Sequence, residues 1–497
     1  MTCKFFYLLL VFAPFWMPGL YPAANAQLST ELSLPINPVA EPATITDIQP
    51  ATTDTAVFQQ ENQFTIIGGQ SSEGPSPNVI HQFQKFDLSS VDEANFLVNP
   101  DVANVISLIN SIQPSAIDGL LTLTSTDPNL ASIANLFIVN PAGIIFGETI
   151  NLQLPANLTA TTASALLFEN YLLSVDGTID EIALPNDEAI DISEAIDIST
   201  VTSTVPSISD LTGMPNGYLL LPVTPSLEES NPLVAALPTG SIDNQGNLQV
   251  VPQASITLIG QYIQNDGNVF APGGTVNFVA KAGDNLLQIS PSNSPLTLNV
   301  IAAETLEVLS PVAEQLPIAT IPATTLPQLL TGGSEANATR VITHQDGSQT
   351  LMDSPSLIPG PGTILVRGDV DVSDNTPTTQ ISSPGTVNFL GDQINIIDSK
   401  IAANGMAQGG SVFIGGMPVI DNLRASYITV SRGSEIIANA SAGNGGIVHI
   451  WADDGIQFLG TATATGVDSS LDGSVNINTS NLLLDIQQQI YDTTEAR

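Results

Sequence analysis

The chain has 497 residues, of which 43% are hydrophobic and only 11% are charged. Its 48 acidic residues outnumber its 9 basic residues and give a formal net charge of −39 at pH 7. Because such a surface repels nucleic acids and anionic lipids, we expect no nucleic-acid partner. Ordinary domains carry about 25% charged residues. A polar surface made of short uncharged side chains is typical of repetitive extracellular β-structures.

Residues 1–26 predict an export signal that is removed from the mature protein. Lys4 supplies a positive charge, residues 5–15 form an apolar core too short to span a bilayer, and a small-residue cleavage site ends at Ala26. Cys3, the only cysteine, would leave with the signal, so we expect no disulfide and no cysteine metal site. No later segment predicts a transmembrane helix.

Short strands are predicted in the first part of the mature chain. Residues 27–44 are polar and contain proline, and we expect a lead-in segment or cap. Residues 64–69 predict a strand that ends at a Gly-Gly turn, and residues 79–86 predict a strand that carries Phe83 and Phe86.

Residues 99–112 predict a single short helix. Asn99 is a suitable helix cap and Pro100 a suitable first-turn residue. Apolar residues then recur at helical spacing, at Val102, Val105, Ile106, Ile109 and Ile112. A strand covered by a loop is the alternative, because valine and isoleucine dominate the segment.

Residues 135–147, Asn-Leu-Phe-Ile-Val-Asn-Pro-Ala-Gly-Ile-Ile-Phe-Gly, predict a strand, a tight corner and a second strand. The string resembles the Asn-Pro-Asn-Gly-Ile signature of the secretion domain of filamentous haemagglutinins. The resemblance extends from about Phe64 to Phe168. Ala142 departs from the signature, because the family has asparagine there. Residues 127–130, Asp-Pro-Asn-Leu, are expected to form an ordinary turn.

The resemblance implies two-partner secretion, in which an outer-membrane β-barrel transporter exports a long exoprotein by way of the periplasm. It places the secretion domain at residues 45–175 and a secretion motif at Asn140, Pro141, Gly143 and Ile144. It further implies a secreted or cell-surface protein that acts as an adhesin or matrix component, with a cell-surface or glycan receptor as a possible partner.

Residues 176–239 form an acidic, variable segment in which residues 188–193 are repeated at once as residues 194–199. A Ca²⁺ site needs several oxygens that converge on one point. Here the acids alternate with isoleucine, and no glycine-bearing loop closes around them. We therefore expect a solvated edge or loop, and no metal.

A short pattern, Gly-x-Val-x-(Phe or Ile), recurs in the second half of the chain. It occupies residues 274–278, 385–389, 410–414, 446–450 and 473–477. A glycine corner followed by alternating apolar positions is typical of a solenoid coil. The expected fold is all-β, a right-handed parallel β-helix of the pectin-lyase-like kind with an N-terminal cap. The alternative is an antiparallel sandwich.

Coils are expected over residues 240–304 and, with a C-terminal cap, over residues 362–497. Residues 305–361 between them are rich in proline and cannot pair as a central strand, so they predict an excursion from the solenoid or a hinge.

Catalytic constellations are missing from the sequence. His81, His344 and His449 show no metal-ligand spacing, and no cofactor-binding loop is present. The nearest carboxylate pair, Asp453-Asp454, precedes glycine and predicts a turn. We therefore expect no enzyme and no cofactor. The alternative function is a carbohydrate-binding or carbohydrate-cleaving β-helix of the periplasm or cell exterior.

Overall fold

The computed structural model describes residues 45–484 of the chain, with gaps. All described residues belong to one compact unit that begins at Thr44. Residues 1–44 and 485–497 lie outside the described part, so the predicted signal, lead-in segment and most of the C-terminal cap do too. The gaps within it are residues 73, 75–76, 184–205, 222–239, 291–296, 304–306, 309–337, 344–348, 354–359, 375–383, 417–422 and 481.

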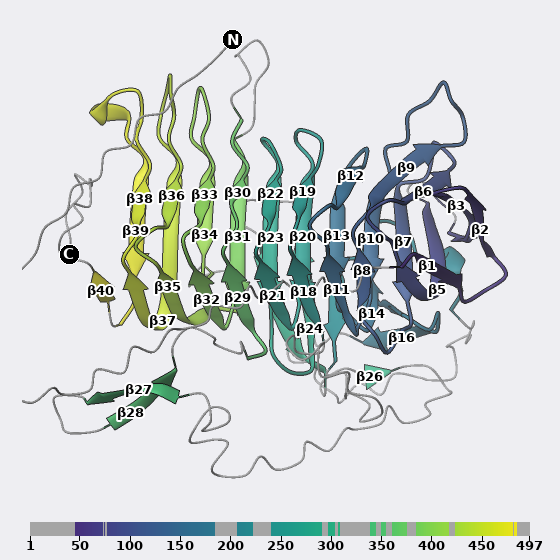
Figure 1. Cartoon of the computed structure of the whole chain (residues 1–497), viewed down its shortest axis with the longest axis horizontal. Helices are drawn as coiled ribbons and strands as arrows, with labels where there is room; N and C mark the ends of the chain where they lie inside the picture. Colours follow the sequence, from purple (N-terminus) through teal and green to yellow (C-terminus); the bar gives the residue numbers. More distant parts are fainter. Residues whose placement is uncertain are drawn as a thin grey trace, which may run out of the picture. The chain divides into compact units, whose positions relative to one another are not determined.

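The chain winds through a stack of coils whose strands build three faces of parallel ladders (Figure 1). The first face contains β5 (Asn78–Asp87), β7 (Asn104–Ile109), β10 (Asn135–Val139), β13 (Leu158–Thr161), β20 (Ser255–Gly260), β23 (Thr275–Ala280), β31 (Thr386–Gly391), β34 (Ser411–Ile414), β37 (Ile447–Phe458) and β39 (Ser474–Asn478). The second face contains β8 (Ser115–Ile117), β11 (Gly143–Phe146), β18 (Ser241–Asn244), β21 (Tyr262–Asn265), β29 (Thr363–Val366), β32 (Gln393–Ile396), β35 (Ala425–Val430), the second half of β37, and β40 (Leu482–Leu484).

The third face consists of two ladders. One contains β3 (Gln63–Gly68), β6 (Glu93–Val98), β9 (Leu120–Ser125) and β12 (Asn151–Gln153). The other contains β19 (Asn247–Gln249), β22 (Asn268–Phe270), β30 (Val370–Asp371), β33 (Lys400–Ala402), β36 (Glu435–Ile437) and β38 (Thr461–Thr463). The predicted all-β parallel β-helix is thereby confirmed, and the antiparallel sandwich is excluded for the coils.

The recurring Gly-x-Val-x-(Phe or Ile) pattern marks the same position in successive coils. Val276 pairs with Val387, Val387 with Val412, and the register continues to Val448 and Val475. The next inward position stacks Phe278 on Phe389, with ring centroids 5.0 Å apart. Alternation along each strand sends these residues inward, so the repeat builds a continuous core.

An antiparallel cap covers the N-terminal end of the stack. β1 (Asp47–Pro50) and β4 (Gln70–Ser71) run antiparallel to β5, and β2 (Thr55–Gln60) runs antiparallel to β3. Lys85 Nζ lies 3.0 Å from Asp47 Oδ2 and 3.2 Å from Asp87 Oδ2, an ion-pair triad across the cap.

The predicted helix over residues 99–112 is wrong, because the structure forms strand β7 there. All six residues of β7 are buried. Val105 and Ile109 point into the coil core, whereas Ile106 and Leu108 belong to a second apolar cluster on the outer side of the first face. A strand buried on both sides loses its alternation of apolar and polar residues, which is why its sequence imitated a helical period.

Two insertions combine into an antiparallel sheet that covers part of the first face. Its strands, in spatial order, are β25 (Thr297–Ala302), β24 (Asn285–Ser290), β17 (Gly217–Leu220), β14 (Ala165–Phe168), β15 (Tyr171–Ser174), β16 (Ile179–Ala183) and β26 (Glu307–Val308). Leu166, Phe168 and Tyr218 of this sheet share an apolar cluster with Phe137 of the coils. Coils are predicted throughout residues 240–304, but β24 and β25 at the end of this segment lie in the antiparallel sheet and not in the coil ladders.

The expected excursion at residues 305–361 lies between coil strands β23 and β29. Its described part includes the hairpin of β27 (Ala338–Thr343) and β28 (Gln349–Asp353). The acidic duplication at residues 188–199 lies outside the described residues.

Candidate functional site

The Asn-Pro string forms the corner between the first and second faces. β10 ends at Val139 and β11 begins at Gly143, as the sequence predicted. The amide of Gly143 donates to the carbonyl of Asn140 over 3.1 Å, which closes a four-residue turn. Pro141 occupies the second position of this turn, where its fixed φ is favourable. The four predicted motif residues thus meet at one corner.

Asn140 joins three successive coils. Its side chain is fully buried, and its Nδ2 donates to Ser115 Oγ over 3.0 Å and to the Gln113 carbonyl over 3.2 Å, both in the preceding coil. Its Oδ1 accepts from the Ala142 amide over 3.0 Å, and its own amide donates to the Thr161 carbonyl, over 3.0 Å, in the following coil. Every polar group of Asn140 is therefore used.

Gly143 is required by backbone geometry. Its φ of +137° lies in a region that L-residues with a side chain rarely adopt. A Cβ at this position would lie 3.1 Å from the Ser241 carbonyl oxygen and 3.3 Å from Pro114 carbons. A side chain here would therefore press on a neighbouring coil as well as strain the backbone.

Ile144 begins an isoleucine column inside the second face. Successive pairings align Ile144 with Ile242, Ile242 with Ile263, and so on through Ile364, Ile394, Ile428 and Ile456. These side chains are 0–2% exposed. The column extends the packing of the corner into the remaining coils.

Ala142, the departure from the signature, is 2% exposed. Its methyl group fills the corner without needing a hydrogen-bond partner, and its carbonyl accepts from the Gly240 amide over 3.3 Å. Of the corner residues, Pro141 alone is part-exposed. The corner therefore offers no free nucleophile, acid or base, and its physical effect is to hold coils in register.

Residues 127–130 form a turn, as predicted. Asp127 Oδ1 accepts from the Asn129 amide over 2.9 Å, and the Leu130 amide donates to the Asp127 carbonyl over 3.1 Å. These bonds are local and exposed, so the turn lacks the coil-bridging contacts of Asn140.

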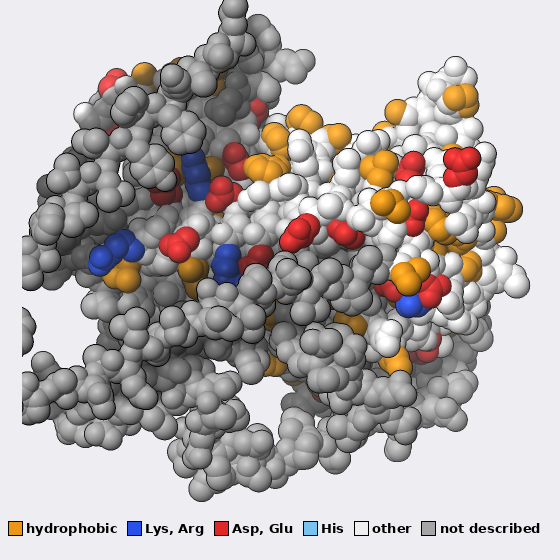
Figure 2. All heavy atoms as spheres, in the orientation of Figure 1, with side chains coloured by type: hydrophobic (Ala, Val, Ile, Leu, Met, Phe, Trp, Pro, Cys, Tyr) orange, Lys and Arg blue, Asp and Glu red, His pale blue; other side chains and the backbone are white. Residues whose placement is uncertain are grey.

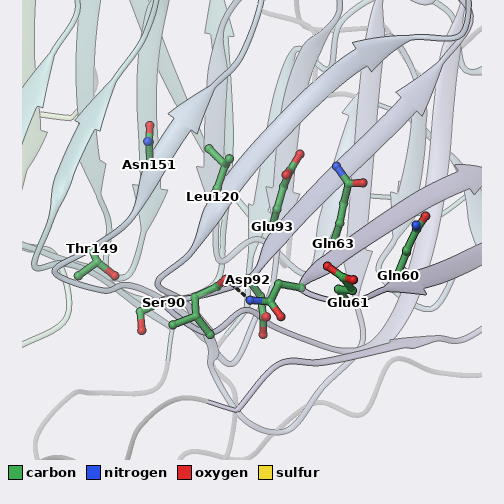
Figure 3. A pocket seen from close by; sticks show the side chains of 11 residues that line it. Gln60, Glu61, Gln63, Ser90, Asp92, Glu93, Leu120, Thr149 and Asn151 are labelled. Carbon is green, nitrogen blue, oxygen red and sulfur yellow. Dashed lines mark hydrogen bonds between the residues drawn. The ribbon is translucent and has the colours of Figure 1, made fainter.

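An open groove of about 610 Å³ lies over the third face of the first coils (Figure 3). Gln63, Glu93, Leu120 and Asn151 stand in line on adjacent strands. Glu61 and Asp92 add further acidity, and the Asp92 carboxylate accepts from Ser89 Oγ over 2.6 Å. The other lining residues are Gln60, Asn62, Ser90, Val91 and Thr149. The lining is polar and acidic and includes no aromatic or basic side chain.

Asparagine side chains of successive coils form a hydrogen-bonded ladder that the sequence did not lead us to predict. Asn104 Nδ2 donates to Asn78 Oδ1 over 2.7 Å, Asn135 Nδ2 donates to Asn104 Oδ1 over 2.8 Å, and Asn157 Nδ2 donates to Asn135 Oδ1 over 2.8 Å. The ladder lies at the start of the first-face strands. An asparagine at or just before the start of successive strands is the signal that could have revealed it.

His81 is buried inside the first coils. Thr55 Oγ1 lies 3.2 Å from its Nδ1, and the rings of Phe83 and Phe96 pack against it. Within the described residues, its Nε2 and the hydroxyl of the opposite Ser107 have no hydrogen-bond partner. Burial lowers the pKa of His81 to about 4, so the imidazole is neutral at pH 7.

The carboxylate pair Asp453-Asp454 lies within the continuous strand β37 and not at the predicted turn. Asp453 Oδ2 pairs with Arg424 Nε over 3.4 Å, and Asp453 Oδ1 accepts from the Trp451 indole over 3.3 Å. Burial lowers the pKa of nearby His449.

The visible face in Figure 2 carries more acidic than basic side chains.

The described ranges hold neither a cluster of metal-binding side chains nor a membrane-spanning helix. No group of three His, Cys, Asp or Glu residues there is placed to hold a metal ion. No helix among the same residues is long and apolar enough to cross a membrane.

The coil stack, with a buried corner that holds successive coils in register, defines a β-helical protein. The family model described as the TPS secretion domain matches residues 43–347, which is more than half of the chain. The chain belongs to this two-partner secretion family, and it is an exoprotein with a partner outer-membrane transporter. The match extends well beyond the expected boundary at residue 175.

Among solved structures, the secretion domain of HMW1 from Haemophilus influenzae is similar, with 13% sequence identity and a TM-score of 0.41. The alignment covers 89% of this chain and 100% of that chain. The comparison with curated proteins gives no significant match.

Proposed function

We propose that the protein is exported through its partner transporter to the cell surface or medium, where it acts as a β-helical adhesin or matrix protein. The observation that carries the proposal is the Asn140 corner, which lies inside the matched family segment and joins three coils. A chain that folds coil by coil outside the membrane cannot slide back, and the corner stabilises the first coils that form.

The adhesin role is favoured over the carbohydrate alternative by the placement of aromatic residues. The largest buried side chains include Phe83, Phe86, Phe96 and Phe137, and the groove on the third face has no aromatic lining. Sugar rings are commonly held by stacking on exposed aromatic faces. The groove on the third face therefore lacks the aromatic stacking platform expected of a sugar-cleaving cleft. No catalytic activity is part of the proposal.

The experiment compares Asn140→Ala with Asn129→Ala in cells that contain the partner transporter. Asn129 lies on an exposed turn and, within the described part of the chain, bonds only to Asp127, so it is a matched asparagine control. We expect wild type and Asn129→Ala in the medium or on the surface, and Asn140→Ala enriched in the periplasm. The purified Asn140→Ala variant should lose about 1–3 kcal/mol of unfolding free energy, because buried partners are left unsatisfied.

Ser115→Ala, which removes one acceptor of Asn140, should show the same defect in weaker form. Equal export of Asn140→Ala and wild type, with Asn140→Ala destabilised, would mean that the corner serves folding alone. Retention of the wild type in the periplasm would contradict the proposed export itself.

A further inference from the structure

The outer surface of the third face repeats a short carboxamide pattern where its two ladders meet. β12 and β19, which lie side by side in successive coils, have the same sequence, Asn-Leu-Gln (Figure 1). In both strands the leucine is buried and the Asn and Gln are exposed. β22 continues the rows, because Asn268 pairs with Asn247 and Phe270 pairs with Gln249. We call the outward side chains of Asn151, Gln153, Asn247, Gln249 and Asn268 the carboxamide array.

Most of the hydrogen-bonding groups of the carboxamide array are free. Asn268 Nδ2 donates to Asn247 Oδ1 over 2.8 Å, which leaves the Nδ2 group of Asn247 available. The side chains of Asn151, Gln153 and Gln249 make no hydrogen bond within the described part of the chain. A carboxamide offers two N–H donors and one acceptor oxygen. The array therefore presents both donors and acceptors on an exposed sheet face.

The carboxamide array is an uncharged zone in a strongly acidic protein. The strands β9, β12, β19 and β22 contain no Lys, Arg, Asp or Glu. The nearest charged positions along the two rows are Glu93, which pairs with Leu120, and Asp371, which pairs with Phe270. These carboxylates repel an anionic ligand, and a cationic ligand gains more from the acidic surface elsewhere. The charge pattern therefore fits an uncharged ligand.

We propose that the carboxamide array binds a neutral, linear polysaccharide whose chain runs along the stack and across the strands. The inference rests on the proposed function as a surface or matrix protein, and it names a ligand for it. Neighbouring strands lie about 4.8 Å apart, close to the length of one sugar residue in an extended chain. Successive sugars can therefore repeat the same contacts, which adds avidity.

The chemistry of the array matches that of sugar hydroxyls, which are also both donors and acceptors. The half-buried ring of Phe270 continues the row of Gln153 and Gln249 and offers one sugar ring an apolar face. The site is an open row of hydrogen-bonding groups and not a cleft, so it suits holding a polymer without cleaving it.

Cosedimentation of the purified full chain with cellulose and with chitin tests the proposal. We expect wild type to bind at least one of these neutral polymers, and soluble alginate, a polyanion, not to compete. Binding should be unchanged between about 10 mM and about 150 mM NaCl, because the contact contains no ion pair for salt to screen. Gln249→Glu should bind at least tenfold more weakly, because it replaces two N–H donors in the middle of the array by a carboxylate.

Gln457→Glu is the matched control, because Gln457 is also exposed on a coil strand but lies on the second face. It should bind like wild type, and urea unfolding checks that both variants are folded. Wild type that binds neither polymer, or Gln249→Glu that binds as well as Gln457→Glu, would overturn the proposal. Wild type that is retained in the periplasm, yet binds after purification, would contradict the proposed export and support this inference.

Discussion

At the scale of single residues, hydrogen bonds of buried polar side chains join neighbouring coils. Asn140 satisfies its amide, its carbonyl and its side chain within three coils. His81 differs, because its Nε2 and the opposite Ser107 hydroxyl have no partner among the described residues. A buried neutral histidine couples the stability of the first coils to pH.

The His81 coupling predicts an acid-sensitive fold. Burial lowers the pKa of His81 from 6.5 to about 4, so the folded state favours the neutral ring. The stabilisation is fully present above pH 6.5 and is lost as pH falls towards 4, with an upper magnitude of about 3 kcal/mol. Urea unfolding between pH 7.5 and 4 should show this loss.

The variant His81→Leu isolates the contribution of the histidine. Its unfolding free energy should fall less over the same pH range, because no ring must be protonated within the core. The same pH dependence in the variant and in wild type would assign the acid sensitivity to carboxylates elsewhere.

At the scale of elements, coil strands are held by columns of identical or similar side chains. The isoleucine column runs from Ile144 through Ile263 to Ile456, and the repeat aligns Val276, Val387 and Val412 in the first face. Each inward residue packs on its equivalents above and below. Loss of one member therefore leaves a cavity between two coils.

Truncation in the middle of the column should be costly. Ile263→Ala removes buried atoms between Ile242 and Ile364 and should lower the unfolding free energy by about 2–5 kcal/mol. The matched control Ile133→Ala, at a position 69% exposed, should stay within about 0.5 kcal/mol of wild type. Urea denaturation measures both. Equal effects of the two substitutions would contradict the column packing.

At the scale of the whole molecule, the charge imbalance acts on folding and on association. With 48 acidic and 9 basic residues, the compact state suffers repulsion that the ion pairs of Lys85, Lys281 and Arg367 offset only locally. Screening by salt reduces repulsion over distances beyond about 10 Å.

Added salt should therefore stabilise the chain. Raising NaCl from about 10 mM to about 150 mM shortens the Debye length from about 30 Å to about 8 Å, so the midpoint of urea unfolding should increase. If ion pairs dominated stability, salt would weaken them and the midpoint of urea unfolding would fall. That outcome would contradict the repulsion argument.

The sequence by itself determined the corner and the repeat. Both depend on local properties: Pro141 fixes φ within the turn, Gly143 permits the positive φ that follows, and alternation within residues 274–278 and its equivalents identifies coil strands. The resemblance carried by these residues also indicated the family correctly.

Only the tertiary structure decided which faces were buried and which distant segments paired. β7 is a strand because it pairs with β5 and β10, and the antiparallel sheet over its outer side hides the period-two pattern. That sheet joins β17 to β24 across intervening coils, and nothing local encodes such a pairing. The asparagine ladder and the burial of His81 likewise depend on stacking, because each needs a neighbour from another turn of the chain.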